Sequence, residues 1–133
     1  MLCTEASRLV CSVLVLQAAL TAAVAALSGL VAGEQALGAA LLAGALTLCA
    51  TLAYAAVWRG VAWVAGEGAG AMLLAHLSGE AAKIAVAIGG LLWCLARFGN
   101  ELPMLPFLAA FVAGLSAYLL ALGMSSVRTR STQ

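Results

Sequence analysis

Two opposite charges stand inside a long apolar stretch of this sequence, and they are the residues best suited to do chemistry. Glu80 and Lys83 lie in a run that we expect to form a helix over residues 71–98. The uncharged part that follows, Ile84 to Ala96, would cover only about 20 Å as a helix, well short of a hydrocarbon core of about 30 Å. A helix that crosses a membrane here must therefore include both charges.

A charge held in lipid is costly, so the pair needs a partner or a task. A span of about 20 residues that ends at Ala96 begins at Leu77, which puts Glu80 about 4.5 Å and Lys83 about 9 Å below the membrane edge. Each such charge costs about 2.5 to 3.5 kcal/mol at mid-membrane and less near the edge. Two interpretations stay open: a structural ion pair between the helices of this chain, and a contact site for another membrane protein.

His76 and Gly79 accompany the charged pair. His76, Glu80 and Lys83 follow one another at spacings of four and three, which puts them along one helical face. Gly79 belongs to a neighbouring row of small residues that starts at Ala71, and such a row lets another helix approach closely. The candidate partner-binding site therefore contains Gly79 and His76 with the pair, although His76 by itself is better explained as a histidine at the membrane interface.

Composition identifies the class of protein. Of the 133 residues, 65% are hydrophobic and 8% are charged, against about 25% charged in an ordinary soluble domain. The four cysteines form no Cys-x-x-Cys and are interpreted as small apolar residues. A net charge of +1 with scattered basic residues gives no sign of nucleic-acid binding. We predict an integral membrane protein that is not an enzyme and needs no cofactor, because no nucleophile–base pairing or metal-ligand cluster has usable spacing.

The apolar segments predict an all-α fold with four transmembrane helices in a single transmembrane domain, residues 1–133. Short connections would fold the first two helices into one antiparallel hairpin and the last two into another. A glycine-rich segment, residues 60–70, would join the two hairpins as a mobile linker. The helices are expected at about 9–31, 36–58, 71–98 and 102–123.

Polar and small residues in the first two helices predict how they pack. Gln17 is the one large polar side chain inside the first helix, and its amide either bonds a neighbouring helix or contacts a partner. We include it in the candidate partner-binding site. Gly38, Ala40 and Gly44 give the second helix a smooth face for contact with the first.

Basic and aromatic residues predict the orientation of the chain. With both termini in the cytoplasm, most arginines lie on the cytoplasmic side, as the positive-inside rule requires, and the charged pair lies in the inner leaflet. The aromatic residues Tyr54, Trp58 and Trp63 cluster around Arg59, which predicts the membrane boundary after the second helix. Topology and interface roles are thus assigned to Arg8, Trp58, Arg59, Arg128 and Arg130.

These features together resemble the ATP synthase subunit I family, small bacterial membrane proteins associated with the F-type ATP synthase. The likeness covers most of the chain, from Arg8 to Gly123, and its most specific element is Gly-Glu-x-x-Lys at residues 79–83. Many members carry Pro-Asn midway along the second helix, where this chain has Ala50-Thr51. The likeness also includes Arg8, Gln17, Gly38, Gly44, Trp58-Arg59 and Pro106.

The resemblance implies a protein of the bacterial cytoplasmic (inner) membrane that assists assembly of the rotor ring of c subunits. Its partners would be c subunits or other membrane-sector subunits, within the lipid bilayer, and a homo-oligomer stays open. The alternative is transport of Mg²⁺ or another cation for the synthase, with Glu80 as the metal ligand and several copies of the chain supplying the oxygen atoms that a hard ion requires. A small drug/proton exporter fits less well, since such proteins carry their coupling carboxylate in the first helix, where this chain has Gln17.

Overall fold

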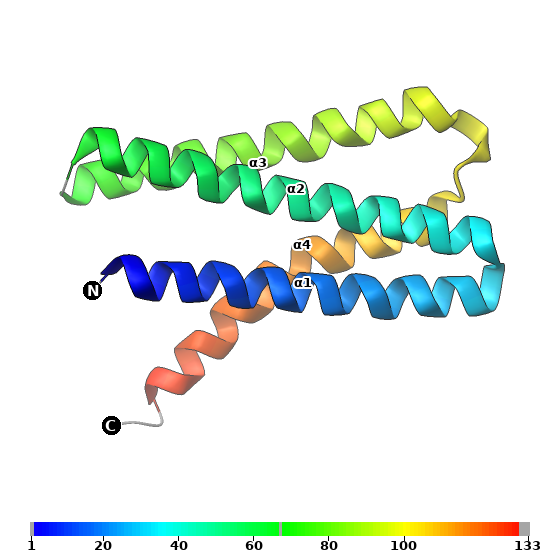
Figure 1. Cartoon of the computed structure of the whole chain (residues 1–133), viewed down its shortest axis with the longest axis horizontal. Helices are drawn as coiled ribbons and strands as arrows, with labels where there is room; N and C mark the ends of the chain where they lie inside the picture. Colours follow the sequence, from blue (N-terminus) through cyan, green and yellow to red (C-terminus); the bar gives the residue numbers. More distant parts are fainter. Residues whose placement is uncertain (1, 67, 131–133) are drawn as a thin grey trace. The chain divides into compact units, whose positions relative to one another are not determined.

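Helices account for nearly all of the described chain (Figure 1). The computed structural model describes the backbone of residues 2–66 and 68–130 and the side chains of residues 10–66 and 68–117. The all-helical prediction is confirmed within these ranges. The elements are α1 (Leu2–Ala32), α2 (Glu34–Ala65), α3 (Ala69–Phe98), a short 3-10 turn (Gly99–Glu101) and α4 (Met104–Arg130).

Among the described residues, three helices are long and apolar enough to cross a membrane. Their apolar stretches are Val10–Ala32, Glu34–Ala65 and Ala69–Glu101, of 23, 32 and 33 residues. A multi-pass membrane protein is compatible with these three helices. The apolar stretch in the described part of α4, Met104–Ala117, is shorter than the roughly 20 residues that a crossing needs, so the fourth crossing stays a prediction.

Glycines with positive φ end the first three helices. Gly33, Gly66 and Gly99 have φ values of 84°, 77° and 49°, a region that other residues adopt only with strain. The N–H of Gly33 donates to the carbonyl of Gly29 at 3.0 Å, the bond that closes a helix whose next residue is left-handed. Each chain reversal therefore needs no more than the glycine and a few flanking residues.

The second helix continues beyond its predicted end at Trp58 and stops at Ala65. Residues 61–65, Val-Ala-Trp-Val-Ala, contain no proline, and the single glycine before them costs a helix only about 1 kcal/mol. The glycine-rich linker predicted for residues 60–70 is therefore wrong, and only residues 66–68 connect α2 to α3.

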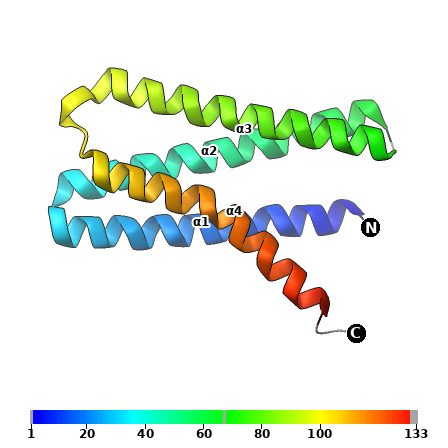
Figure 2. The same ribbon diagram turned by 180° about the vertical axis from the view of Figure 1, so that it is seen from behind.

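The chain forms two compact units, and the division between them falls inside α2, after Ala45. The first unit contains residues 1–45 and 100–133, which include α1, the start of α2 and α4. α4 packs against α1, as the two opposite views show (Figures 1 and 2). Thr21 of α1 lies directly against Gly44 of α2, so the predicted contact between the first two helices is present at this glycine.

The second unit contains residues 46–99, where the rest of α2 and α3 form an antiparallel pair. Tyr54 of α2 lies against Gly79 of α3, and Leu46 lies against Gly90. The buried residues of α3 are Ala75, Gly79, Ala87 and Cys94. These contacts join α2 to α3, and α4 packs on α1, so the predicted grouping into two separate hairpins is not confirmed.

Candidate functional site

The predicted charged pair lies well inside α3, which runs without interruption from Ala69 to Phe98. Glu80 Oε2 and Lys83 Nζ are 3.8 Å apart, as an i, i+3 pair on one helix. A charge-assisted hydrogen bond between such groups would be about 2.7–2.9 Å long. The two groups therefore attract each other electrostatically without forming a close hydrogen bond, and the carboxylate keeps most of its capacity to accept one.

The two members of the pair differ in exposure. The Lys83 side chain is 13% exposed and the Glu80 side chain 30% exposed. Lys83 lies four residues after Gly79 and four before Ala87, so it belongs to the same row of α3 as these two buried residues. Its four-carbon stem leaves the helix on the packed side, whereas Glu80 is turned toward the accessible side. Within the described part of the chain, Lys83 is the one polar contact of the Glu80 carboxylate.

Tyr54 joins the site from the neighbouring helix. Its hydroxyl oxygen and His76 Nδ1 are 2.8 Å apart, and the hydroxyl donates this hydrogen bond when Nδ1 carries no proton. The two rings meet edge to face, with centroids 5.9 Å apart and an interplanar angle of 82°. This is a favourable arrangement for two aromatic rings. The bond ties α2 to α3 at the turn of helix before Glu80.

Gly79 allows this approach because it has no side chain. A Cβ atom at Gly79 would lie 2.8 Å from Cδ2 and Cε2 of Tyr54 and 3.2 Å from its backbone oxygen. Carbon atoms in favourable contact stand about 3.5–4.0 Å apart, so a methyl group would not fit without movement of α2. Tyr54 thus contacts both His76 and Gly79, the two residues that were predicted to accompany the charges.

Sequence reasoning assigned Tyr54 to the membrane boundary with Trp58 and missed its role in the site. The role of Tyr54 could have been predicted from its distance, in residues, from the turn between α2 and α3. Tyr54 and Gly79 are nearly equally far, in residues, from position 67, and an antiparallel pair brings such positions to the same level. That signal required the position of the turn, which the predicted linker of residues 60–70 obscured.

The contact between Tyr54 and Gly79 also gives a level for the membrane boundary in the second unit. Arg59 follows Tyr54 by five residues and Leu74 precedes Gly79 by five, so these two positions lie at similar heights on the antiparallel helices. If the exposed Arg59 marks the edge, Glu80 lies six residues, or about 9 Å, below it. The independent count from Ala96 gave about 4.5 Å. If α3 crosses a membrane, both estimates put the carboxylate inside the hydrocarbon layer.

The other predicted residues lie elsewhere. Gln17 belongs to the first unit, where it is 1% exposed and its Nε2 donates to the carbonyl of Gly114 at 3.0 Å. This is the bond to a neighbouring helix that was one of its two predicted roles; contact with a partner stays a prediction. Trp58 is half-buried and Arg59 is exposed in the second unit. The side chains of Arg8, Arg128 and Arg130 lie outside the described residues.

The residues thus group into one candidate site and one internal contact. His76, Gly79, Glu80 and Lys83 lie together on α3, with Tyr54 beside them on α2. Within the described residues, no three His, Cys, Asp or Glu side chains come together in a way that could hold a metal ion. The chemistry available at the site is charge attraction and hydrogen bonding.

Comparison of the chain with protein-family models, with curated proteins and with solved structures gives no match. What the protein does is therefore inferred from its residues and their geometry.

Proposed function

We propose that this protein binds other transmembrane helices and that it assists assembly of the rotor ring of an F-type ATP synthase by contact with c subunits. The observation that carries the first part is the partly exposed Glu80 carboxylate beside Lys83 in the interior of α3, a helix of membrane-spanning length. The second part rests on the resemblance of Gly-Glu-x-x-Lys at residues 79–83 to the subunit I family. We place the protein in the bacterial cytoplasmic membrane, with both termini in the cytoplasm and four crossings arranged as two hairpins.

Energetics favour a task for the pair rather than a purely structural role. An unneeded charge in lipid costs a few kcal/mol, and replacement of an internal ion pair by apolar side chains is often neutral or stabilising. At a spacing of 3.8 Å the two groups form no close hydrogen bond with each other, so the Glu80 carboxylate can still accept hydrogen bonds. A partner that donates such a bond would offset the cost of holding this carboxylate in lipid.

The geometry supports different roles for the two charges in binding a partner. A c subunit carries a carboxyl group of its own in the membrane, as the family resemblance implies. In its protonated form that carboxyl donates a hydrogen bond, and the more exposed Glu80 is the acceptor it would meet. In its ionised form it is attracted by Lys83 and repelled by Glu80. In the absence of a partner, Glu80 compensates the charge of Lys83.

Two substitutions test this proposal in a strain that depends on the chain for ring assembly. Glu80→Gln keeps the shape of the side chain and weakens the acceptor, while Lys83→Met keeps an unbranched apolar stem and removes the charge. We expect each to lower the yield of assembled c ring at equal protein level. Gly89→Ala is the matched control, because it lies on the same helix, is exposed and meets nothing within 4 Å. Normal ring yield in both charge variants would remove the pair from the mechanism.

Transport of Mg²⁺ is the second candidate, and the partly exposed Glu80 carboxylate is the observation that favours it. Mg²⁺ keeps several waters and takes one or two carboxylates, so copies of Glu80 from a homo-oligomer would have to converge. Uptake of Mg²⁺ by liposomes that contain only this protein, and its loss in Glu80→Gln, would support transport. An absence of uptake in liposomes that contain the folded native chain would contradict it.

A further inference from the structure

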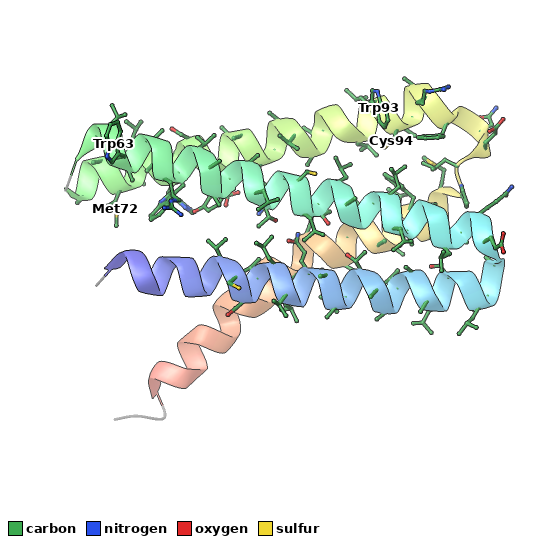
Figure 3. The ribbon with its side chains drawn as sticks, in the orientation of Figure 1. Trp63, Met72, Trp93 and Cys94 are labelled. Carbon is green, nitrogen blue, oxygen red and sulfur yellow. The ribbon has the colours of Figure 1, made fainter. Side chains whose placement is uncertain are left out.

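The end of the α2–α3 hairpin exposes several large apolar side chains. We define the hairpin tip as residues 61–66 and 68–73 of the second unit. Trp63 is 88% exposed and Val64 79% exposed, and Met72 and Leu73 are exposed on the other helix. Figure 3 shows Trp63 and Met72 at this end, and Trp93 near the opposite end of α3. Exposed apolar side chains gathered in this way mark a surface that something covers.

The level of the tip relative to Arg59 identifies what covers it. Trp63 follows Arg59 by four residues, which is about 6 Å along the helix. The polar layer on each side of a bilayer is about 5–7.5 Å thick, from a total of about 40–45 Å around a core of about 30 Å. If the core ends near Arg59, Trp63 therefore lies within the headgroup layer, which is the position that tryptophan prefers in membrane proteins.

The exposed face of α3 also favours lipid as the material that covers the tip. Exposed apolar residues continue from the tip along this helix at helical spacing, so the surface of the tip is continuous with the surface that faces lipid if α3 crosses the membrane. The exposed guanidinium of Arg59 lies at the base of the tip, where it would meet lipid phosphates. The exposed apolar residues that continue from the tip along α3 are Leu73, Leu77, Ile84, Ile88 and Leu92.

We infer that the hairpin tip is an interfacial anchor that lies in the headgroup layer of the bilayer, with Trp63 as its main contact. This inference rests on insertion of α2 and α3 into a membrane and does not depend on the identity of any protein partner. The anchor would fix the height of the hairpin, and with it the depth of Glu80, because tryptophan resists movement both toward water and toward the hydrocarbon core. A docking surface for a soluble protein is the competing explanation.

Fluorescence of single tryptophans in liposomes tests the inference. The chain with Trp58→Phe and Trp93→Phe keeps Trp63, and the chain with Trp58→Phe and Trp63→Phe keeps Trp93 as the matched control. Each is reconstituted in liposomes whose lipids carry bromine either near the headgroup or deep in the acyl chain. We expect Trp63 to lose more emission to the shallow bromine than to the deep one, and to be quenched by aqueous acrylamide much less than free tryptophan.

The control and the refuting result are well separated. Trp93 precedes Arg97 by four residues, which puts it on the hydrocarbon side of the boundary that Arg97 would mark. The deep bromine should therefore quench Trp93 more strongly than it quenches Trp63. Quenching of Trp63 by acrylamide to the level of free tryptophan, without quenching by either lipid, would overturn the anchor in favour of a surface left for a protein. If a double substitution impairs folding, the difference in quenching between the native chain and the Trp63→Phe chain gives the contribution of Trp63. This measurement does not depend on ring assembly. The inference can therefore fail while the proposed function holds, and the proposed function can fail while the inference holds.

Discussion

Substitution of Gly79 by alanine is the sharpest test of how α2 and α3 pack. The added methyl carbon would lie 2.8 Å from two ring carbons of Tyr54. Favourable carbon contacts begin at about 3.5 Å, so the ring must retreat by about 0.7 Å. Rotation of the ring alone is insufficient, because the backbone oxygen of Tyr54, at 3.2 Å, also restricts the new methyl group.

Retreat of α2 also affects the hydrogen bond between Tyr54 and His76. Its present length of 2.8 Å would increase toward about 3.5 Å, beyond the useful range for such a bond. Overpacking typically costs about 1–3 kcal/mol, and a hydrogen bond between helices in a membrane protein is worth about 0.6 kcal/mol on average. We therefore expect Gly79→Ala to lose about 1.5–3.5 kcal/mol of unfolding free energy through packing.

The measurement needs a control for helix propensity, since alanine favours a helix over glycine by up to about 1 kcal/mol. Gly89 provides it, because a Cβ there meets nothing within 4 Å. Reversible unfolding in mixed micelles, followed by circular dichroism, gives the unfolding free energies of both variants. The expected difference between Gly89→Ala and Gly79→Ala is the packing cost above. Equal stabilities would refute the close approach of Tyr54 to Gly79.

Three further expectations concern contacts within single units. Gly44→Ala should destabilise the chain by about 1–3 kcal/mol because its methyl group meets Thr21, and Thr21→Ala in the same chain should recover most of that loss in the same unfolding assay. Gln17→Leu should cost about 0.6–2 kcal/mol, the worth of its bond to α4; a fall in ring yield without loss of stability would instead assign Gln17 to a partner. Tyr54→Phe and His76→Ala should each destabilise the chain, and their double-mutant cycle should show a coupling energy of about 0.6 kcal/mol, whereas strict additivity would argue against their hydrogen bond.

The presence of helices followed directly from the sequence, but the end of α2 did not. Apolar composition over more than 20 residues leaves few structures other than a helix, because in lipid each backbone group must find its partner within the segment. The helix was predicted to end at the expected membrane boundary, where aromatic residues surround Arg59. A helix has no reason to stop at that boundary when apolar residues without proline follow, and residues 61–65 are of this kind.

The site was predictable where it depended on spacing along one helix and was not where it depended on a second helix. Spacing alone brought His76, Gly79, Glu80 and Lys83 together on α3, and the structure has them there. The contact with Tyr54 required the register of α2 against α3, which a single sequence does not contain. The side of α3 that faces α2 was also unknown, so the unequal exposure of Glu80 and Lys83 could not be foreseen.

The chemistry of the two side chains is compatible with this unequal exposure. Lysine has a long flexible stem, so it can leave α3 on the packed side, cover apolar surface with its methylene groups and carry the ammonium away from its own backbone. Glutamate is shorter, and its carboxylate must stay close to the helix that bears it. Gly79 and Ala87, the residues before and after Lys83 in its row, are both buried. The cation can therefore be kept by the chain itself, while the carboxylate, 30% exposed, stays within reach of whatever approaches α3.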